Sequence, residues 1–214
     1  MLQDELDEIT QNTRKLVQAE RLAVSERAVE ELFATGIEER ILRVGEVAPE
    51  FALRDANNRM VRSPDLLTLG PLVIKFFRGR WCPYCVTELE TWRDRYEELR
   101  ARGVLLAAIS PQIQRQSDFM ATQHALPFPV LTDTNNAVAE RFGLVYTVPE
   151  YYRDYYRSIL VNIPFVNGET SWRLPLPATY VLDRGGVVVF AEAHADFRVR
   201  PEPEEAIAAA LAAC

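Results

Sequence analysis

Two cysteines three positions apart, Cys82 and Cys85, are the side chains of this sequence best suited to chemistry. They belong to the segment 81–85, Trp-Cys-Pro-Tyr-Cys, which follows an apolar stretch typical of a strand and leads into a sequence typical of a helix. Cys82 is expected at the N-cap of that helix and Pro83 at its first position, where the missing N–H of proline costs no hydrogen bond. Unpaired N–H groups of the first turn and the positive end of the helix dipole stabilise a thiolate there. The spacing therefore predicts a redox centre whose two sulfurs can join in a disulfide.

Charged residues flank the pair on both sides. Arg78 and Arg80 precede it, and positive charge lowers the pKa of a thiol from about 8.5 into the reactive range. Glu88 lies one turn beyond Cys85 on the predicted helix, where its carboxylate can take the proton of that thiol. The alternative for Glu88 is an ordinary solvated carboxylate on the helix surface. The whole segment predicts a cysteine-dependent oxidoreductase.

The composition of the chain indicates which classes of partner and which location suit such a redox centre. The 214 residues carry a net charge of −7, which disfavours nucleic acid and anionic membranes as partners. No apolar run reaches the ~18 residues needed to cross a bilayer. The acidic segment 1–8 lacks the apolar core of a signal peptide. The cytoplasm is therefore the expected location, where two close cysteines are expected to be catalytic rather than a structural disulfide.

Metal and cofactor sites are not indicated by the sequence. A structural zinc site takes about four ligands, and the pair is joined only by Cys214 and two separate histidines, His124 and His194. His124 is expected on a helix surface and His194 at the end of a strand. The centre is expected to work without a metal or an organic cofactor.

The predicted elements place the pair in an α/β domain. Residues 1–43 have apolar side chains at three- and four-residue steps, which predicts a helical arm. This arm packs on its own domain or on a second copy, or it binds a separate partner. From residue 44 strands and helices alternate, which predicts a sandwich with a mixed sheet. The aromatic-rich insertion 145–176 interrupts this order, and insertions of such length are usually functional or interfacial. The predicted strands are 72–77, 104–109, 128–131, 178–182 and 187–193, and the predicted helices are 83–102, 112–124, 136–142 and 204–213.

Four stretches resemble one family, and they occur in its order. They are Gly-x-x-Ala-Pro-x-Phe-x-Leu at 45–53, Cys-Val-Thr-Glu-Leu at 85–89, Asp-x-x-Asn-x-Val-Ala-x-x-Phe-Gly at 133–143, and Pro-Ala-Thr-Tyr-Val-Leu-Asp followed by Gly-Gly at 177–186. Together they resemble the peroxiredoxin-like AhpC/TSA branch of the thioredoxin-fold superfamily. The resemblance implies a thioredoxin-like domain over 44–214, with a central mixed sheet flanked by helices. The helical arm predicted at 1–43 precedes this domain as an N-terminal extension.

The cysteine segment combines the patterns of two branches of that superfamily. Peroxiredoxins typically have Pro-x-x-x-Thr/Ser-x-x-Cys, and the hydroxyl and a distant arginine orient the peroxide. Aligned on this pattern, Cys85 takes the attacking position, Cys82 the hydroxyl position and Arg78 the proline position, while Pro177 stands where the arginine belongs. Thioredoxins instead have Trp-Cys-x-x-Cys and a cis-proline facing the disulfide, which Trp81 to Cys85 and Pro177 match.

The favoured activity is peroxide reduction. A thiolate attacks the O–O bond and becomes a sulfenic acid, the second cysteine condenses on it, and an external dithiol reduces the disulfide. The alignment with the peroxiredoxin pattern favours Cys85 as the attacking cysteine. The greater exposure expected of an N-cap side chain favours Cys82. Arg78, Arg80 or Arg173 can replace the missing arginine and stabilise the leaving alkoxide. The expected partners are a hydroperoxide and a thioredoxin-like or low-molecular-weight thiol reductant.

Two other functions stay open at this point. In disulfide exchange, Cys82 attacks a substrate disulfide, Cys85 resolves it, and a cis-Pro177 presents backbone to the substrate. In a redox-switched binding protein, the pair has an ordinary pKa and controls a surface of the arm or of the insertion. In each enzyme, Trp81, Pro83 and Tyr84 border the pair and are expected to contact substrate.

Two further expectations concern assembly. The arm or the insertion can support a homodimer. Cys214, at a frayed end, is either dispensable or a resolving cysteine for a second copy, since relatives of the resembled family often keep a cysteine near the C-terminus.

Overall fold

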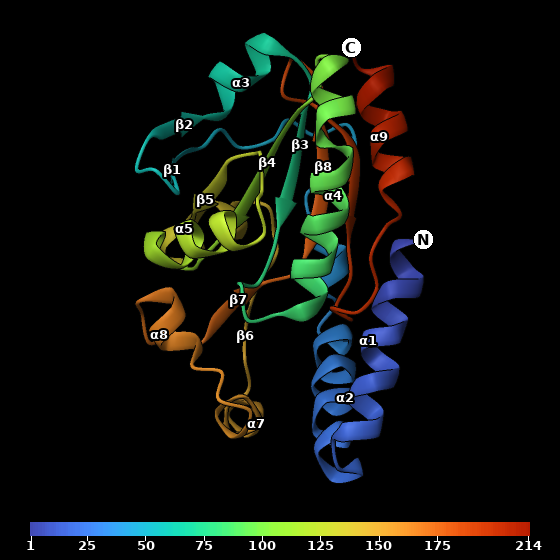
Figure 1. The fold of residues 1–214 in the computed structure, drawn as a ribbon, viewed down its shortest axis with the longest axis vertical. Coiled ribbons are helices and arrows are strands. Elements are labelled where there is room, and N and C mark those ends of the chain that lie inside the picture. The colour runs from blue at the N-terminus through green and yellow to red at the C-terminus, as the bar shows by residue number, and fades with distance from the viewer.

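The computed structural model describes residues 1–214, and seven of its strands form one mixed sheet in the order β2-β1-β5-β4-β3-β8-β9 (Figure 1). The strands are β1 Ala52–Asp55, β2 Met60–Arg62, β3 Leu72–Phe76, β4 Leu105–Ser110, β5 Val130–Thr132, β6 Val145–Thr147, β7 Arg173–Pro175, β8 Ala178–Leu182 and β9 Val188–Ala193. The helices are α1 Leu2–Leu16, α2 Ala19–Ala34, α3 Ser63–Leu69, α4 Pro83–Ala101, α5 Gln114–Gln123, α6 Ala137–Arg141, α7 Glu150–Ser158, α8 Ile163–Asn167 and α9 Pro203–Ala212. The predicted α/β fold with a mixed central sheet is confirmed.

The centre of the sheet is buried on both faces. β3 pairs with β4 in parallel, Leu72 opposite Leu105, and with β8 in antiparallel, Leu72 opposite Leu182. Helices α4 and α9 cover one face, while α3 and α6 contribute to the core on the other. All residues of β3 are buried, and the strand is apolar except for Lys75, as a strand covered on both faces requires.

The N-terminal arm is a helical hairpin rather than the continuous helical run expected from its apolar pattern. Val17 is extended, and α2 begins two residues later at Ala19. The backbone N–H groups of Leu2 and Gln3 donate to the carboxylate of Glu202, at 2.9 and 3.0 Å. Helix α1 lies against α4 and α2 against α7, so the arm packs on its own chain (Figure 1).

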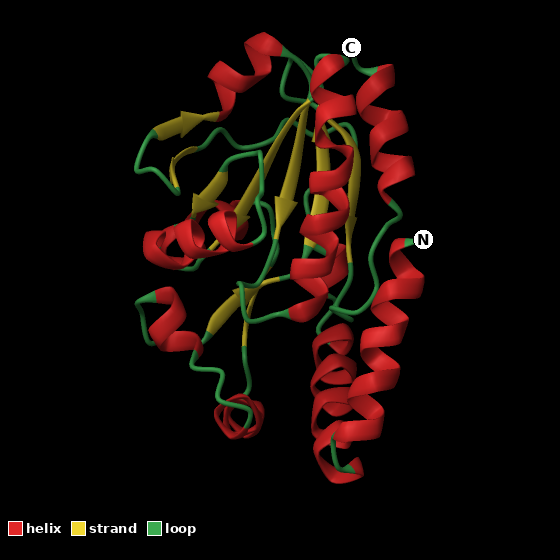
Figure 2. Ribbon diagram, viewed as in Figure 1, coloured by secondary structure: helices red, strands yellow, loops and turns green.

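The aromatic insertion folds into a ribbon and two short helices. β6 and β7 pair in antiparallel, and α7 and α8 lie between them in sequence (Figure 2). Its aromatic side chains fill a small core of their own, in which Tyr152, Tyr156 and Trp172 pack against Ala28 of α2. The insertion and the arm therefore cover each other beside the start of α4.

Besides the helices and strands of the insertion, β2 and α3 were not expected from the sequence. None of the helices combines the length and the apolar character that a membrane span requires.

Candidate active site

The two cysteines lie where the sharp turn after β3 meets α4. Cys82 is the N-cap of α4 and Pro83 its first residue, as predicted. The turn passes through Gly79, whose φ of 147° favours glycine, and a Cβ there would lie 2.6 Å from Nε1 of Trp81. Both thiols are free and fully buried. The expectation that the N-cap sulfur is the more open one is wrong, because the arm and the insertion cover this end of the helix.

Arg78 holds the sulfur of Cys82. Its Nη2 donates to Sγ at 3.1 Å and its Nη1 donates to the hydroxyl of Tyr156 at 3.3 Å. The guanidinium is buried against the ring of Phe197, 3.8 Å from the ring centroid. Burial opposes ionisation of Cys82, but the hydrogen bond from Cys85 and the charges of Arg78 and Arg200 lower its pKa to about 5. Cys82 is therefore a thiolate at neutral pH.

Cys85 has the opposite character. Burial, together with the hydrogen bond and the charge of the Cys82 thiolate, raises the pKa of Cys85 well above its usual range. At neutral pH the pair therefore holds one proton, which stays on Cys85. An activated thiolate beside a protonated thiol is the arrangement that a two-cysteine redox reaction needs.

Behind Cys85 lies a buried cluster of three charged side chains. Glu88 accepts from Lys75 Nζ at 2.5 Å and from Arg200 Nε at 3.1 Å, and all three side chains are almost fully buried. Lys75 also contacts the hydroxyl of Thr179 on β8. Burial lowers the pKa of Lys75 below its usual range, and the neighbouring carboxylate of Glu88 offsets only part of this effect. Arg200 reaches from this cluster to the sulfur of Cys85, at 3.8 Å. Glu88 is thus not the solvated carboxylate of the alternative interpretation.

Several residues proposed from the sequence point elsewhere. Arg80 is exposed and engages helix α5, through the side chain of Gln116 and the ring of Phe119 at 4.7 Å. Arg173 pairs with Glu140 at 2.5 Å. Neither guanidinium is free to replace the missing arginine beside the sulfurs.

Pro177 does not have the geometry of the thioredoxin pattern. No peptide bond of the chain is cis, so the expectation of a cis-proline is wrong. Pro177 is buried directly before Ala178, which pairs with Phe76 at the end of β3. The proline is therefore close to the turn that carries the cysteines, as a trans residue.

The aromatic neighbours of the pair are packed in the structure. Trp81 lies edge-on to Tyr156, with ring centroids 5.2 Å apart. The hydroxyl of Tyr84 contacts that of Thr10 on α1 at 3.0 Å, and its ring packs on Phe197. Pro83 is exposed.

The remaining candidates lie away from the pair. Cys214 is exposed, and its sulfur lies 3.6 Å from the carbonyl oxygen of Arg102 at the far end of α4. A helix of 19 residues spans roughly 28 Å, so Cys214 does not reach Cys82 of its own chain. His124 contacts Glu90 at 3.0 Å and His194 contacts Glu192 at 2.7 Å.

Sequence reasoning missed three residues of the site: Lys75, Tyr156 and Arg200. Lys75 carried a signal, because it is one of two lysines in the chain and the single charge in an apolar strand. Arg200 had none, since it is 115 positions from the cysteine that it contacts.

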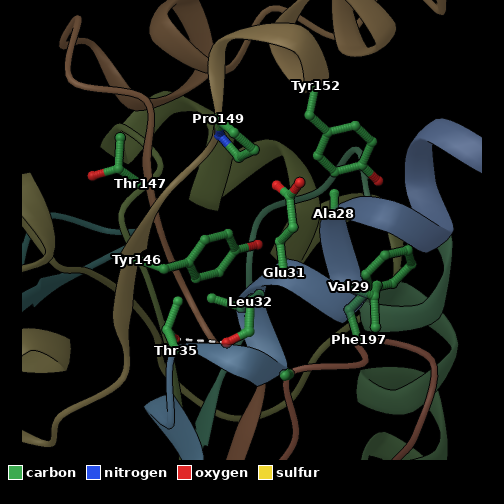
Figure 3. A pocket seen from close by; sticks show the side chains of 11 residues that line it. Ala28, Val29, Glu31, Leu32, Thr35, Tyr146, Thr147, Pro149, Tyr152 and Phe197 are labelled. Atoms are coloured by element: carbon green, nitrogen blue, oxygen red, sulfur yellow. Dashed lines mark hydrogen bonds between the residues drawn. The ribbon is translucent and has the colours of Figure 1, made fainter.

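Two cavities adjoin this site. One, of about 230 Å³, is lined by the arm, by α7 and by Arg78, Trp81, Pro83 and Tyr84. The other, of about 170 Å³, lies between α2 and β6, and Glu31, Tyr146 and Tyr152 point into it (Figure 3). Tyr152 and Phe197 line both cavities.

Comparison with known proteins identifies relatives. The model of the AhpC/TSA family matches residues 44–191. The chain is 28% identical over 144 residues to the chloroplastic peroxiredoxin Q of Arabidopsis thaliana, covering 67% of this chain and 56% of that protein. It is 30% identical over 103 residues to peroxiredoxin Bcp of Escherichia coli K12, covering 48% of this chain and 65% of that protein. The match thus spans little more than half the length of the plant relative.

Solved structures show the same fold. Peroxidoxin BcpB from Mycobacterium tuberculosis superposes with a TM-score of 0.62 at 22% identity, over 80% of this chain and 97% of that one. The yeast mitochondrial 1-Cys peroxiredoxin superposes with a TM-score of 0.59 at 16% identity, over 78% and 74%. The predicted fold family is confirmed, and α1 and α2 lie outside the residues matched by the family model.

Proposed function

Because the chain belongs to the AhpC/TSA family, we propose that it is a thiol-dependent peroxidase in which Cys82 attacks a hydroperoxide and Cys85 resolves the product. The observation that carries this proposal is the 3.1 Å contact between Arg78 and the sulfur of Cys82, whose pKa is lowered to about 5. A sulfur that is a thiolate at neutral pH and has a guanidinium beside it is equipped for attack on an O–O bond.

The first step oxidises Cys82. Its thiolate attacks the outer oxygen of ROOH, an S–O bond forms, the O–O bond breaks, and RO⁻ leaves. Arg78 stabilises the negative charge as it moves from sulfur to the leaving oxygen. The proton held by Cys85 passes to RO⁻, which yields the alcohol ROH and a second thiolate.

The second step joins the sulfurs. The Cys85 thiolate attacks the sulfenic sulfur of Cys82, an S–S bond forms, the S–O bond breaks, and hydroxide leaves to the solvent, where the buffer neutralises it. Arg200, 3.8 Å from the sulfur of Cys85, stabilises that thiolate while it exists. Since both cations of the cluster bind Glu88, we assign Glu88 the positioning of Arg200 in place of the role of a base.

An external dithiol returns the disulfide to the thiol state. A thioredoxin-like protein or a low-molecular-weight thiol fits this role, in a reducing compartment such as the cytoplasm. Disulfide exchange stays the second candidate, because the segment Trp81 to Cys85 matches the thioredoxin pattern. The trans Pro177 counts against it, whereas the burial of both sulfurs applies equally to the two candidates.

The test is stopped-flow fluorescence of the reduced protein mixed with hydrogen peroxide, for wild type, Cys82→Ser and Cys85→Ser. We expect rapid oxidation in Cys85→Ser, ending at a sulfenic acid that dimedone traps, and none in Cys82→Ser. Rapid oxidation that survives in Cys82→Ser instead makes Cys85 the attacker. Slow oxidation of all three, with rapid reaction toward a protein disulfide, replaces the peroxidase by disulfide exchange.

A further inference from the structure

The guanidinium of Arg78 is anchored by two hydrogen bonds. Its Nη2 donates to the sulfur of Cys82 at 3.1 Å, and its Nη1 donates to the hydroxyl of Tyr156 at 3.3 Å. Its Nε–H is buried without a partner. A guanidinium is planar and its donors form a rigid fork. Two anchored ends therefore also fix the direction in which the remaining donor points.

We propose that Tyr156 is the positioning residue of Arg78, and that its hydroxyl holds the guanidinium in the orientation that serves both the sulfur of Cys82 and the leaving oxygen. The proposal rests on the peroxidase function proposed above and adds a residue that acts through Arg78. Tyr156 lies in α7, so the insertion 145–176 takes part in the reaction through this hydroxyl.

The charge states around Arg78 suit this division of roles. The titratable groups with the strongest influence on its pKa are Cys82, Tyr156, Tyr146 and Cys85. Cys82 is the one whose pKa is lowered, and burial raises the pKa of the other three. Tyr156 therefore accepts from Arg78 as a neutral hydroxyl and does not compete with the thiolate for the positive charge. The thiolate binds the charge, and the hydroxyl sets the direction of the guanidinium.

The ring of Tyr156 is itself held in place. Its centroid lies 4.7 Å from that of Tyr152 and 5.2 Å from that of Trp81, which it meets edge-on. The hydroxyl of Tyr152 in turn contacts that of Ser25 on α2 at 2.9 Å. Precise positioning of a reacting group requires a supporting side chain that is locked by packing, and Tyr156 meets this requirement.

Removal of the hydroxyl separates positioning from a purely structural role. Without it, a buried N–H of Arg78 lacks its acceptor, which is costly. The guanidinium is then expected to turn toward another acceptor or toward water, away from its place beside the sulfur. The alternative is that Tyr156 is only one more ring in the small core of the insertion. Its hydroxyl would then affect the stability of the protein and leave the reaction unchanged.

The test compares Tyr156→Phe with Tyr155→Phe, the same change one position earlier on α7. Tyr155 is the matched control because its hydroxyl is not a hydrogen-bond partner of Arg78. The rate constant with hydrogen peroxide is measured by stopped flow as a function of pH. The readout is the plateau above the pKa of Cys82, because there the thiolate fraction no longer limits the rate.

We expect the plateau of Tyr156→Phe to fall about tenfold, the size of effect that loss of a hydrogen bond to a charged group produces. Tyr155→Phe is expected to keep the wild-type plateau. The pKa of Cys82, measured by thiolate absorbance in a Cys214→Ser background, should rise in Tyr156→Phe by less than in Arg78→Met. A folded Tyr156→Phe with the plateau and the pKa of wild type overturns the proposal, as does an equal loss in both variants.

A second measurement applies should Tyr156→Phe not fold. In Cys82→Ala the hydroxyl of Tyr156 is the one remaining hydrogen-bond partner of Arg78. Nitrogen-15 NMR of this variant is expected to give separate resonances for the two Nη atoms of Arg78, since the anchored guanidinium rotates slowly. One averaged resonance overturns the proposal. Failure of the wild type to reduce hydrogen peroxide overturns the peroxidase function together with the proposal, whereas the results named above overturn the proposal alone.

Discussion

Removal of the charge of Arg78 is the sharpest test of how Cys82 is activated. The pKa of about 5 lies about four below the ordinary value of 9.0, which corresponds to about 5 kcal/mol in favour of the thiolate. A unit charge 3.1 Å away contributes about 5 kcal/mol at an effective dielectric constant of about 20. The charge of Arg78 is therefore large enough to lower the pKa by this amount. Burial opposes the shift, and the hydrogen bond from Cys85 and the charge of Arg200 contribute to it.

Arg78→Met keeps an apolar side chain of similar length and removes the charge. Because burial of the sulfur remains, we expect the pKa of Cys82 to rise to about 8.5 or above. The thiolate fraction at pH 7 then falls from nearly all of the protein to about 3%, and the rate constant with hydrogen peroxide at that pH falls about 30-fold. Loss of charge stabilisation of the leaving alkoxide lowers the rate further.

The assay is the ultraviolet absorbance of the thiolate as a function of pH, in a Cys214→Ser background so that the exposed thiol does not contribute. Arg80→Met is the matched control, since Arg80 is two positions away and engages α5 instead of a sulfur. Circular dichroism of each variant checks that it is folded. An unchanged low pKa in folded Arg78→Met would refute the reasoning, because the charge of Arg78 would not be its source.

Three further predictions follow from the same charges. The stability of the reduced protein should rise with pH from about 5 to about 8.5, because there the unfolded chain keeps the Cys82 proton that the folded chain has released. Urea unfolding along that range measures the rise, and in Cys82→Ser it should vanish. Glu88→Gln leaves Lys75 and Arg200 buried without their carboxylate and should lower the free energy of unfolding by about 3–5 kcal/mol. The control Glu90→Gln removes only partly exposed pairs and should change it by at most about 1 kcal/mol; equal losses in the two variants would contradict the argument. Oxidation to the disulfide should speed amide hydrogen exchange in α1 and α2, and identical exchange in both redox states would speak against coupling between the arm and the pair.

Local signals explain what the sequence could predict. The apolar run of β3, the N-cap position of Cys82 and the proline after it are all encoded within a few residues, and each was confirmed. Alternation of strands and helices was enough for a mixed sheet. The break in the arm had no such signal, because Val17 and Gln18 are neither glycine nor proline and the extended turn there depends on packing against α4 and α7.

The residues of the site likewise include some that a local pattern predicts and some that it does not. Arg78 was found because it is four positions from Cys82. Arg200 reaches Cys85 only because the chain returns across the face of the sheet before α9, and no local pattern marks that return. The expectation of an open N-cap failed for a related reason. The first turn of a helix is open by default, and here distant segments, the arm and α7, cover it.

Burial of Arg78 beside Cys82 is favourable only while Cys82 carries a negative charge. In the reduced protein the thiolate of Cys82 partners the buried guanidinium of Arg78. Formation of the disulfide removes that negative charge and leaves the guanidinium buried without an anion, which is strongly unfavourable. We therefore expect the oxidised site to admit water or an external anion to Arg78, which requires movement of the arm or of α7, the elements that line the adjoining cavity. The same contact that shelters the thiolate in the reduced protein is thus expected to favour access of a reductant to the disulfide once the thiolate is lost.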